Sequence, residues 1–224
     1  MNSVNHTIRM GTSVLLGMIL GSYVFISNAE GSDLNSLSRI NGRIEVESNQ
    51  NIGNISAING RVTLHSGVKA QHIDTINGSI NALGEAEALS LKTINGAITL
   101  DSNITIHGDV RTINGNINIA ANSLVNGEVR TVNGDITLRG ATIAHDLQTG
   151  NGSIFLAEHS TVYGDLIVEG HHSLFTQVLN FANKQKPAIH IGADTVVKGD
   201  IHLHQEVELF VHEAATIGKI YYHY

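Results

Sequence analysis

Residues 110–119 have the sequence Val-Arg-Thr-Ile-Asn-Gly-Asn-Ile-Asn-Ile, and closely related runs recur along the chain. The Asn-Gly pair within this run occurs seven times, at intervals of 18 or 19 residues. Self-similarity at such a short, fixed period is typical of a solenoid, in which each repeat forms one coil of a stack. The asparagines of the seven pairs are Asn41, Asn59, Asn77, Asn95, Asn114, Asn133 and Asn151.

Four positions of the repeat are almost always apolar. They lie four and one residues before the asparagine and three and five residues after it, and 27 of the 28 positions hold an apolar residue, with Gly150 the exception. Most are Ile or Val, which favour strands because they are β-branched. We therefore predict four inward-facing columns. The column directly before the asparagines contains Ile40, Ile58, Ile76, Ile94, Ile113 and Val132.

This pattern predicts an all-β protein, a single parallel β-helix with about 18–19 residues per coil, about ten coils and a right-handed winding. The period is too short for a helix–loop–helix repeat. The alternative is an antiparallel meander in which each Asn-Gly pair forms a hairpin turn. Hairpins would give a repeat of roughly ten residues, so the observed spacing favours the solenoid.

The Asn-Gly pairs are expected to form corners of the coil. A corner needs a positive φ, which Gly adopts freely and Asn tolerates better than most residues. Asparagines that stack from coil to coil are also expected to bond to one another through their side-chain amides. The seven asparagines are therefore predicted to form a structural ladder.

The composition excludes several classes of function. The chain has 224 residues, no Cys and a formal net charge of −7. Without Cys there is no disulfide, no thiol catalysis and no Cys-based zinc or iron–sulfur site, and the mild acidity argues against nucleic acid as the main partner. No phosphate-binding Gly-rich loop and no zincin motif occurs in the sequence, so we expect neither an enzyme nor a cofactor.

Residues 1–29 have the layout of a secretory signal peptide. His6 and Arg9 lie in a short polar start, residues 10–26 are uncharged and largely apolar, and Ser27-Asn28-Ala29 offers small residues for cleavage. An uncleaved anchor is the alternative, although this apolar run is at the short limit for spanning a membrane. We expect the mature chain, residues 30–224, to be periplasmic or extracellular and to have no transmembrane span.

A second recurring element continues the winding after the last Asn-Gly pair. Gly-Asp-Ile or a related triplet begins at Gly108, Gly127, Gly164, Gly199 and Gly218. The step from Gly164 to Gly199 is 35 residues, close to two coils. Within this step the pattern is weakest at about residues 174–187, which contain the one Pro. We predict an irregular coil or an outward loop there.

Two charged columns are predicted on the outer surface. Asp109, Glu128 and Asp146 form one, and Lys92, Arg111 and Arg130 form the other. Adjacent columns of opposite sign usually neutralise each other on solvated strands. The alternative is that the basic column forms a binding strip for a polyanion or a glycan.

Threonine and histidine columns suggest two further functions, neither of which we favour. Thr75, Thr93, Thr112, Thr131 and Thr149 are expected on the surface, but ice-binding solenoids present two threonine ranks and here the next column is mixed. Histidine is abundant toward the C-terminus, and no fixed motif there completes a metal site, so we predict no metal. His204 and His223 are one coil apart and are expected to stack; His190, His202 and His212 lie nearby.

The repeat resembles two bacterial β-solenoid groups. Thr131-Val-Asn-Gly-Asp-Ile136 is similar to the repeat of an adhesin domain family, a resemblance that covers residues 36–156. The triplets at Gly164, Gly199 and Gly218 resemble those of bactofilins, the polymer-forming cytoskeletal proteins, over roughly residues 160–220. These resemblances imply a parallel β-helix with a structural or adhesive role and no catalytic residues. The export signal departs from bactofilins, which are cytoplasmic or membrane-associated.

From these observations we expect a non-enzymatic, exported structural or adhesive β-solenoid of the cell envelope. Its expected partners are other copies of itself, through end-to-end or lateral assembly, or an envelope or extracellular polysaccharide. The alternative function is a polysaccharide-binding or polysaccharide-degrading β-helix protein. The two differ in whether a groove carries aromatic residues and carboxylates.

Overall fold

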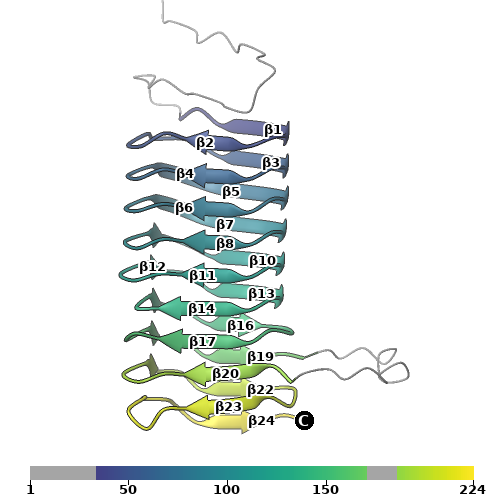
Figure 1. Cartoon of the computed structure of the whole chain (residues 1–224), viewed down its shortest axis with the longest axis vertical. Coiled ribbons are helices and arrows are strands. Elements are labelled where there is room, and N and C mark those ends of the chain that lie inside the picture. The colour runs from purple at the N-terminus through teal and green to yellow at the C-terminus, as the bar shows by residue number, and fades with distance from the viewer. Residues whose placement is uncertain (1–33, 171–185) are drawn as a thin grey trace, which may run out of the picture.

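The chain is a parallel β-solenoid. The computed structural model describes residues 34–170 and 186–224, which form 24 strands and no helix. Each strand pairs in parallel with its equivalent in the next coil, and the coils stack into a straight rod (Figure 1). The predicted parallel β-helix is confirmed, with about nine turns of roughly 19 residues rather than about ten.

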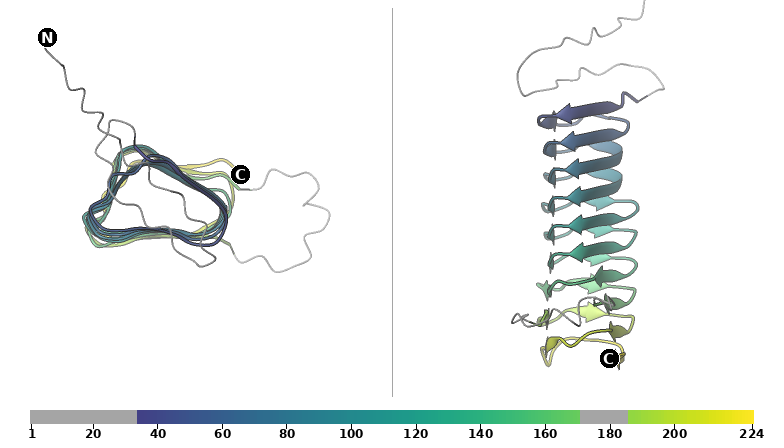
Figure 2. Two further views of the ribbon diagram at one scale, coloured as in Figure 1. Left: turned by 90° about the horizontal axis from the view of Figure 1, so that it is seen from above. Right: turned by 90° about the vertical axis from the view of Figure 1, so that its right-hand side faces the viewer.

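Seen from above, the rod has a roughly triangular outline (Figure 2). We name its sides face A, face B and face C. Face A, which ends at the Asn-Gly corner, contains β1 (Leu37–Asn41), β3 (Ile55–Asn59), β5 (Lys69–Asn77), β7 (Glu87–Asn95), β10 (Val110–Asn114), β13 (Val129–Asn133), β16 (Leu147–Thr149), β19 (Leu166–Val168), β22 (Ile201–Leu203) and β24 (Ile220–Tyr222).

Face B follows the Asn-Gly corner and is a sheet of nine strands. These are β2 (Ile44–Val46), β4 (Val62–Leu64), β6 (Ile80–Ala82), β8 (Ile98–Leu100), β11 (Ile117–Ile119), β14 (Ile136–Arg139), β17 (Ile154–Ala157), β20 (Ala188–Ile191) and β23 (Glu208–Val211).

Face C has the shortest strands and joins face A in one sheet of 15 strands, because the long β5 and β7 extend across both faces. Its own strands are β9 (Thr105–Ile106), β12 (Leu124–Val125), β15 (Thr142–Ile143), β18 (Thr161–Val162) and β21 (Val196–Val197).

The core is a set of apolar columns that run along the rod. Three of the four predicted columns are buried, as Val110, Ile117 and Ile119 show in the central coil. Face C adds a further buried column, which contains Ile106 and Val125. Side chains of successive coils therefore stack on their own equivalents, and a continuous interior forms that no single coil could enclose.

The fourth predicted column lies on the surface, so its assignment to the core is wrong. Ile40 is 65% exposed, the other four isoleucines of the column are 41–44% exposed, and Val132 is half-buried. Side chains alternate between the two sides of a strand. The positions four and one residues before the asparagine lie on one strand and are three residues apart, so only one of them can point inward.

The threonine column takes the inward position instead, so its predicted surface location is wrong too. Thr131 and Thr149 are fully buried, and the other members are nearly so. A buried hydroxyl needs a hydrogen-bond partner. Thr93 donates to the carbonyl of Gly78 at 2.9 Å, and Thr131 donates to that of Gly115 at 3.0 Å. With the equivalent bonds of Thr112 and Thr149, these bonds tie β7, β10, β13 and β16 to the preceding Asn-Gly corner, whereas the buried hydroxyl of Thr75 has no partner among the described residues.

The glycines of the Asn-Gly corners serve close approach rather than an unusual φ. Of the seven pairs, only Gly42 has a positive φ, so the predicted reason for the glycines is wrong. A Cβ on Gly115 would lie 2.0 Å from the carbonyl oxygen of Gly96 in the preceding coil. The equivalent contacts at Gly78 and Gly134 are 1.8 Å and 2.1 Å. Only glycine allows the corners to stack.

The left-handed backbone occurs at a different corner, between faces B and C. Asn49, Gly67, Asn103 and Asn122 have φ between 59° and 72°, and Glu85 is equivalent with φ 61°. Asn and Gly tolerate this conformation best. Their recurrence at this position was a signal that the sequence analysis did not use.

The 35-residue step is one turn rather than two. β18 pairs directly with β21, and β19 pairs with β22, so residues 166 and 201 are neighbours in adjacent coils. The additional residues lie between β19 and β20. The predicted loop at about 174–187 falls largely outside the described residues, and so does the predicted signal peptide at 1–29. No helix long enough to cross a membrane occurs in residues 34–170 or 186–224.

Replacement of Gly115 by Ala tests the stacking constraint. The new methyl group would overlap the carbonyl of Gly96, and we expect a loss of about 3 kcal/mol in the free energy of unfolding, the upper end for overpacking. Gly84→Ala is the control, because its Cβ would meet its nearest atom at 3.8 Å. Denaturant unfolding followed by circular dichroism measures both variants. Equal stability of the two would contradict the constraint.

Candidate functional site

Face A presents three outward columns side by side. We name them the charged column, the isoleucine ladder and the asparagine ladder, at three, one and zero residues before the corner asparagine. The parallel register of β1, β3, β5, β7, β10 and β13 keeps each column in line from coil to coil. The charged column contains Ser38, Ser56, Asp74, Lys92, Arg111 and Arg130, and the isoleucine ladder contains Ile40, Ile58, Ile76, Ile94, Ile113 and Val132.

The asparagine ladder is continuous over all seven Asn-Gly corners. Each side-chain amide donates to the amide oxygen of the asparagine one coil earlier, at 2.8–3.0 Å. These are the amide bonds expected from the sequence. The ladder gives the edge of face A a fixed row of oriented amides rather than independent side chains.

The isoleucine ladder borders an open groove along face A. The groove has a volume of about 860 Å³ and is lined by the ladder, by the charged column and by the threonine column between them. Five isoleucines at least 41% exposed are an unusual feature, because contiguous exposed apolar patches commonly mark interaction sites. Chemically, this groove offers apolar contact area with charges on one side and amides on the other.

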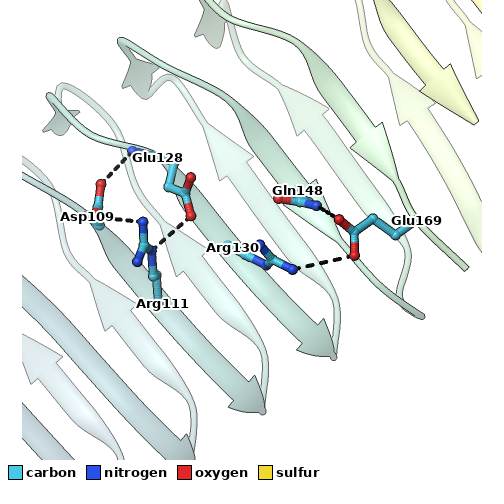
Figure 3. A network of polar contacts seen from close by, with 6 residues as sticks. All are labelled: Asp109, Arg111, Glu128, Arg130, Gln148 and Glu169. Atoms are coloured by element: carbon cyan, nitrogen blue, oxygen red, sulfur yellow. Dashed lines mark hydrogen bonds and ion pairs between the residues drawn. The ribbon is translucent and has the colours of Figure 1, made fainter. Parts of the chain in front are cut away.

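Arg111 is paired with carboxylates on the adjacent column (Figure 3). Its guanidinium lies 2.9 Å from Asp109 and 2.8 Å from Glu128. The contact to Glu128 is an ion pair without hydrogen-bond geometry at Nε. Asp109 also accepts a hydrogen bond from the backbone N–H of Glu128 at 3.1 Å. The predicted neutralisation of opposite columns therefore holds at this residue.

The other two basic residues of the predicted binding strip differ from each other. Arg130 lies 3.4 Å from Glu169, which also accepts a hydrogen bond from Gln148 (Figure 3). Lys92 has no side-chain partner among the described residues, and the same is true of Asp74 in the preceding coil. The basic strip is thus largely neutralised, and its one cation without a partner among the described residues, Lys92, lies one coil from the unpaired carboxylate of Asp74.

Acidic side chains also form a ladder at the corner between faces C and A. Asp165 donates its backbone N–H to the carboxylate of Asp146 at 2.8 Å. Asp200 and Lys219 repeat this bond to the acidic residue of the coil before each. Asp146, predicted as a surface column residue, is half-buried, and its carboxylate binds the backbone of the next coil.

A second surface site, which the sequence analysis did not identify, lies on face B near the C-terminal end. Phe155, His190 and Phe210 stack in consecutive coils, with ring centroids 5.0 Å and 4.5 Å apart and nearly parallel planes. They line a groove of about 1090 Å³ together with Arg139 and His212. Only the correct register across the 35-residue step aligns His190 with Phe155.

The C-terminal histidines stack but form no metal-binding group. The rings of His204 and His223 are 4.3 Å apart, as expected from the sequence. His202 Nδ1 lies 3.2 Å from His223 Nε2, and its other nitrogen lies 3.8 Å from Asp165. Within the part of the chain that the structure describes, no group of three or more potential metal ligands occurs.

Shifted pKa values occur at two ion pairs away from face A's groove. The hydrogen bond from Lys69, at 2.9 Å, lowers the pKa of Glu87. The Lys186–Glu206 hydrogen bond raises the pKa of the lysine and lowers that of the glutamate. Each shift has the sign expected for an exposed pair of opposite charges.

Comparison of the chain with protein-family models, with curated proteins and with solved structures finds no match. The resemblances to the adhesin domain family and to bactofilins therefore stay predictions.

Replacement of Asn114 by Ala tests the contribution of the ladder. Asn114 donates to Asn95 and accepts from Asn133, so the variant loses two exposed hydrogen bonds. We expect a loss of about 1–3 kcal/mol in the free energy of unfolding, at roughly 0.5–1.5 kcal/mol for each of the two bonds. Asn118→Ala, which removes an exposed outward asparagine on face B, is the control and should change little. Thermal unfolding of both variants provides the comparison, and an unchanged midpoint for Asn114→Ala would contradict the role.

Proposed function

We propose that this chain is a non-enzymatic structural or adhesive β-solenoid of the cell envelope. The observation that carries the proposal is the register of face A, where three outward columns repeat in line over six coils. Such a surface presents the same chemical groups at a fixed spacing of about 4.8 Å per coil. It suits an extended or repetitive partner better than a small substrate.

The rod is built to hold that spacing. The asparagine ladder, the buried threonines and the acidic ladder each bond one coil to the next. Nearly every contact along the axis is therefore between adjacent coils, as in other solenoids. This arrangement supports a mechanical or display role.

Export to the periplasm or beyond is part of the proposal. It is supported by the composition of residues 1–29, which has the layout of a signal peptide. The absence of Cys from the sequence makes the fold independent of the redox state of its compartment.

The C-terminal end supports end-to-end assembly of the rods. In the last coil, the inward positions hold Val211 and Tyr222, which are 38% and 59% exposed, whereas their equivalents Ile191 and Leu203 are buried. β23 and β24 each pair on one side only among the described strands. An open strand edge over exposed core side chains is a template for pairing with another chain.

Two measurements test the proposed function directly. We expect the purified chain to be retained by isolated bacterial cell envelopes in a sedimentation assay. We expect no release of reducing ends from a panel of envelope and extracellular polysaccharides. Hydrolysis of any of these polysaccharides would overturn the non-enzymatic assignment, and failure to be retained would overturn the adhesive role.

Val211→Glu tests the open end. A charge at this inward position of the last coil should block stacking of a second rod, because burying an unpaired carboxylate is costly. We expect electron micrographs to show concentration-dependent filaments of the parent chain and none of the Val211→Glu variant. Asn118→Glu adds the same charge on the side of the rod and should leave filaments unchanged. A parent chain without filaments at any concentration would argue against end-to-end assembly.

The aromatic ladder on face B favours a second candidate function, binding of a polysaccharide. Phe155 and Phe210 are partly exposed, and their groove also holds Arg139 and Glu158. Aromatic surfaces bordered by polar groups can bind sugar rings through apolar contact and hydrogen bonds. The aromatic residues and the single carboxylate of this groove support the alternative function.

Phe210→Ala separates this candidate from a purely structural role. If the groove binds a polysaccharide, affinity electrophoresis should show at least a tenfold loss of retardation in a gel that contains the bound polymer. Tyr163→Ala removes an exposed aromatic side chain that contacts Lys198, outside this groove, and should bind normally. Equal binding by both variants would exclude the aromatic ladder as the sugar site.

A further inference from the structure

The isoleucine ladder has six rungs, and the charges beside it change at its centre. The centre lies between β5 and β7, that is, between Ile76 and Ile94. On the N-terminal side the charged column contains two serines and Asp74. On the C-terminal side it contains Lys92 and two arginines. Asp74 and Lys92, the two charged members without a side-chain partner among the described residues, are the ones that border the centre.

We propose that the isoleucine ladder and the charged column together, called the strip from here on, are the contact surface of an antiparallel homodimer. The occupant of this surface is a second copy of the chain. The two-fold axis would run parallel to the strands of face A, between β5 and β7. Such an isologous contact uses the same patch on both copies, so the patch must be complementary to itself. The strip has this property.

The two-fold axis places each column over its own equivalent with the coil order reversed. Ile76 then meets the partner's Ile94, and the six rungs overlap along their full length. In the charged column, Asp74 meets the partner's Lys92 and Lys92 meets the partner's Asp74. The four charges form a square of alternating sign. The remaining pairs oppose no like charges, because Ser56 meets the partner's Arg111 and Ser38 meets the partner's Arg130.

The adjacent column on face A is compatible with this arrangement. His72 meets the partner's Ser90, and Glu128 meets the partner's Ser36, so no like charges oppose each other there. Arg39 donates to the backbone carbonyl of Arg43 at 2.7 Å, beyond the Asn-Gly corner. Its guanidinium is therefore already engaged within its own chain.

Other arrangements of two copies lose this charge pairing. A parallel pairing of the two ladders, about an axis along the rod, would reverse the strand direction, so the charged column would face the partner's Asn-Gly corner and leave Asp74 and Lys92 without each other's charge. An antiparallel pairing shifted by half a step, centred on β7, would place Lys92 against the partner's Lys92. Opposed like charges are destabilising on strand surfaces. Among the antiparallel registers, only the one centred between β5 and β7 pairs Asp74 with Lys92 and overlaps all six rungs.

A polyanion is a weaker candidate for the same strip. Two of its three basic residues are neutralised by Asp109, Glu128 and Glu169 in the chain itself. An anionic polymer would also meet the free carboxylate of Asp74. Self-complementarity uses both free charges, whereas a polyanion uses only one.

The size of the strip predicts a weak dimer. Five steps between coils span about 24 Å, and six residues of face A span about 17 Å. This footprint of about 400 Å² is half of the roughly 800 Å² that each partner buries in a standard interface. We therefore expect a dissociation constant of about 10–100 μM, typical of small interfaces rather than obligate dimers. The inference does not rest on the proposed function, because a rod can be structural or adhesive with or without lateral pairing.

Charge reversal tests the register. In sedimentation equilibrium from about 5 to 500 μM, the parent chain should dimerise, and Asp74→Lys or Lys92→Asp alone should weaken dimerisation at least tenfold. The double variant Asp74→Lys/Lys92→Asp restores opposite charges across the axis and should return to within threefold of the parent. Circular dichroism checks that each variant is folded. A double variant no better than the singles, or a parent chain that is monomeric throughout, would overturn the proposal.

Thiol cross-linking tests the orientation. The chain has no Cys, so Ile58→Cys and Ile113→Cys each introduce a single thiol. Residue 58 lies opposite the partner's residue 113 at the sheet spacing of about 10 Å, whereas two copies of residue 58 are about 17 Å apart. A bis-maleimide with a reach of about 10 Å should join the two variants when mixed and neither variant alone. Cross-linking of each variant to itself, or no cross-linking in the mixture, would overturn the antiparallel dimer. If the parent chain is monomeric and binds a polysaccharide, and Ile94→Lys abolishes that binding, the strip is a polysaccharide site instead.

Discussion

Each coil of this protein lies directly on the next, and that contact constrains the rest of the structure. At the Asn-Gly corners the backbones approach so closely that a methyl group on Gly115 would lie 2.0 Å from the carbonyl oxygen of Gly96. Parallel in-register pairing then places every residue over its equivalent one coil away. Since the stacking is direct, any side chain placed once per coil becomes a column along the rod.

The columns explain why polar residues are tolerated at positions that repeat so often. Each corner asparagine satisfies the amide of the next, and four of the five threonines in the buried column donate to a carbonyl of the preceding corner. Polar groups that would be costly to bury alone are therefore paired by repetition. The same repetition aligns Phe155, His190 and Phe210 into one aromatic ladder.

On face A the repetition produces a surface that the core does not require. The isoleucines before the corner asparagines point outward, and they lie between a row of amides and a column of charges whose sign changes at its centre. Exposed apolar side chains in a continuous row favour association. The functional proposals therefore converge on contacts along the side and at the end of a rod, rather than on chemistry within a pocket.

The period of Asn-Gly and the apolar positions three and five residues after it were enough to predict a parallel β-helix and an asparagine ladder. The sequence alone did not decide which side of the strand Ile94 and Thr93 occupy. Both residue types favour strands, and the apolar character of a side chain does not by itself show whether it points to the core or to solvent. The buried side of each strand is set by the core, which exists only when coils stack. Tertiary pairing likewise decided that residues 166 and 201 are one coil apart, since a repeat count cannot distinguish an inserted segment from an extra turn. For the same reason, the aromatic ladder and the unpaired charges of Asp74 and Lys92 emerged only from the structure.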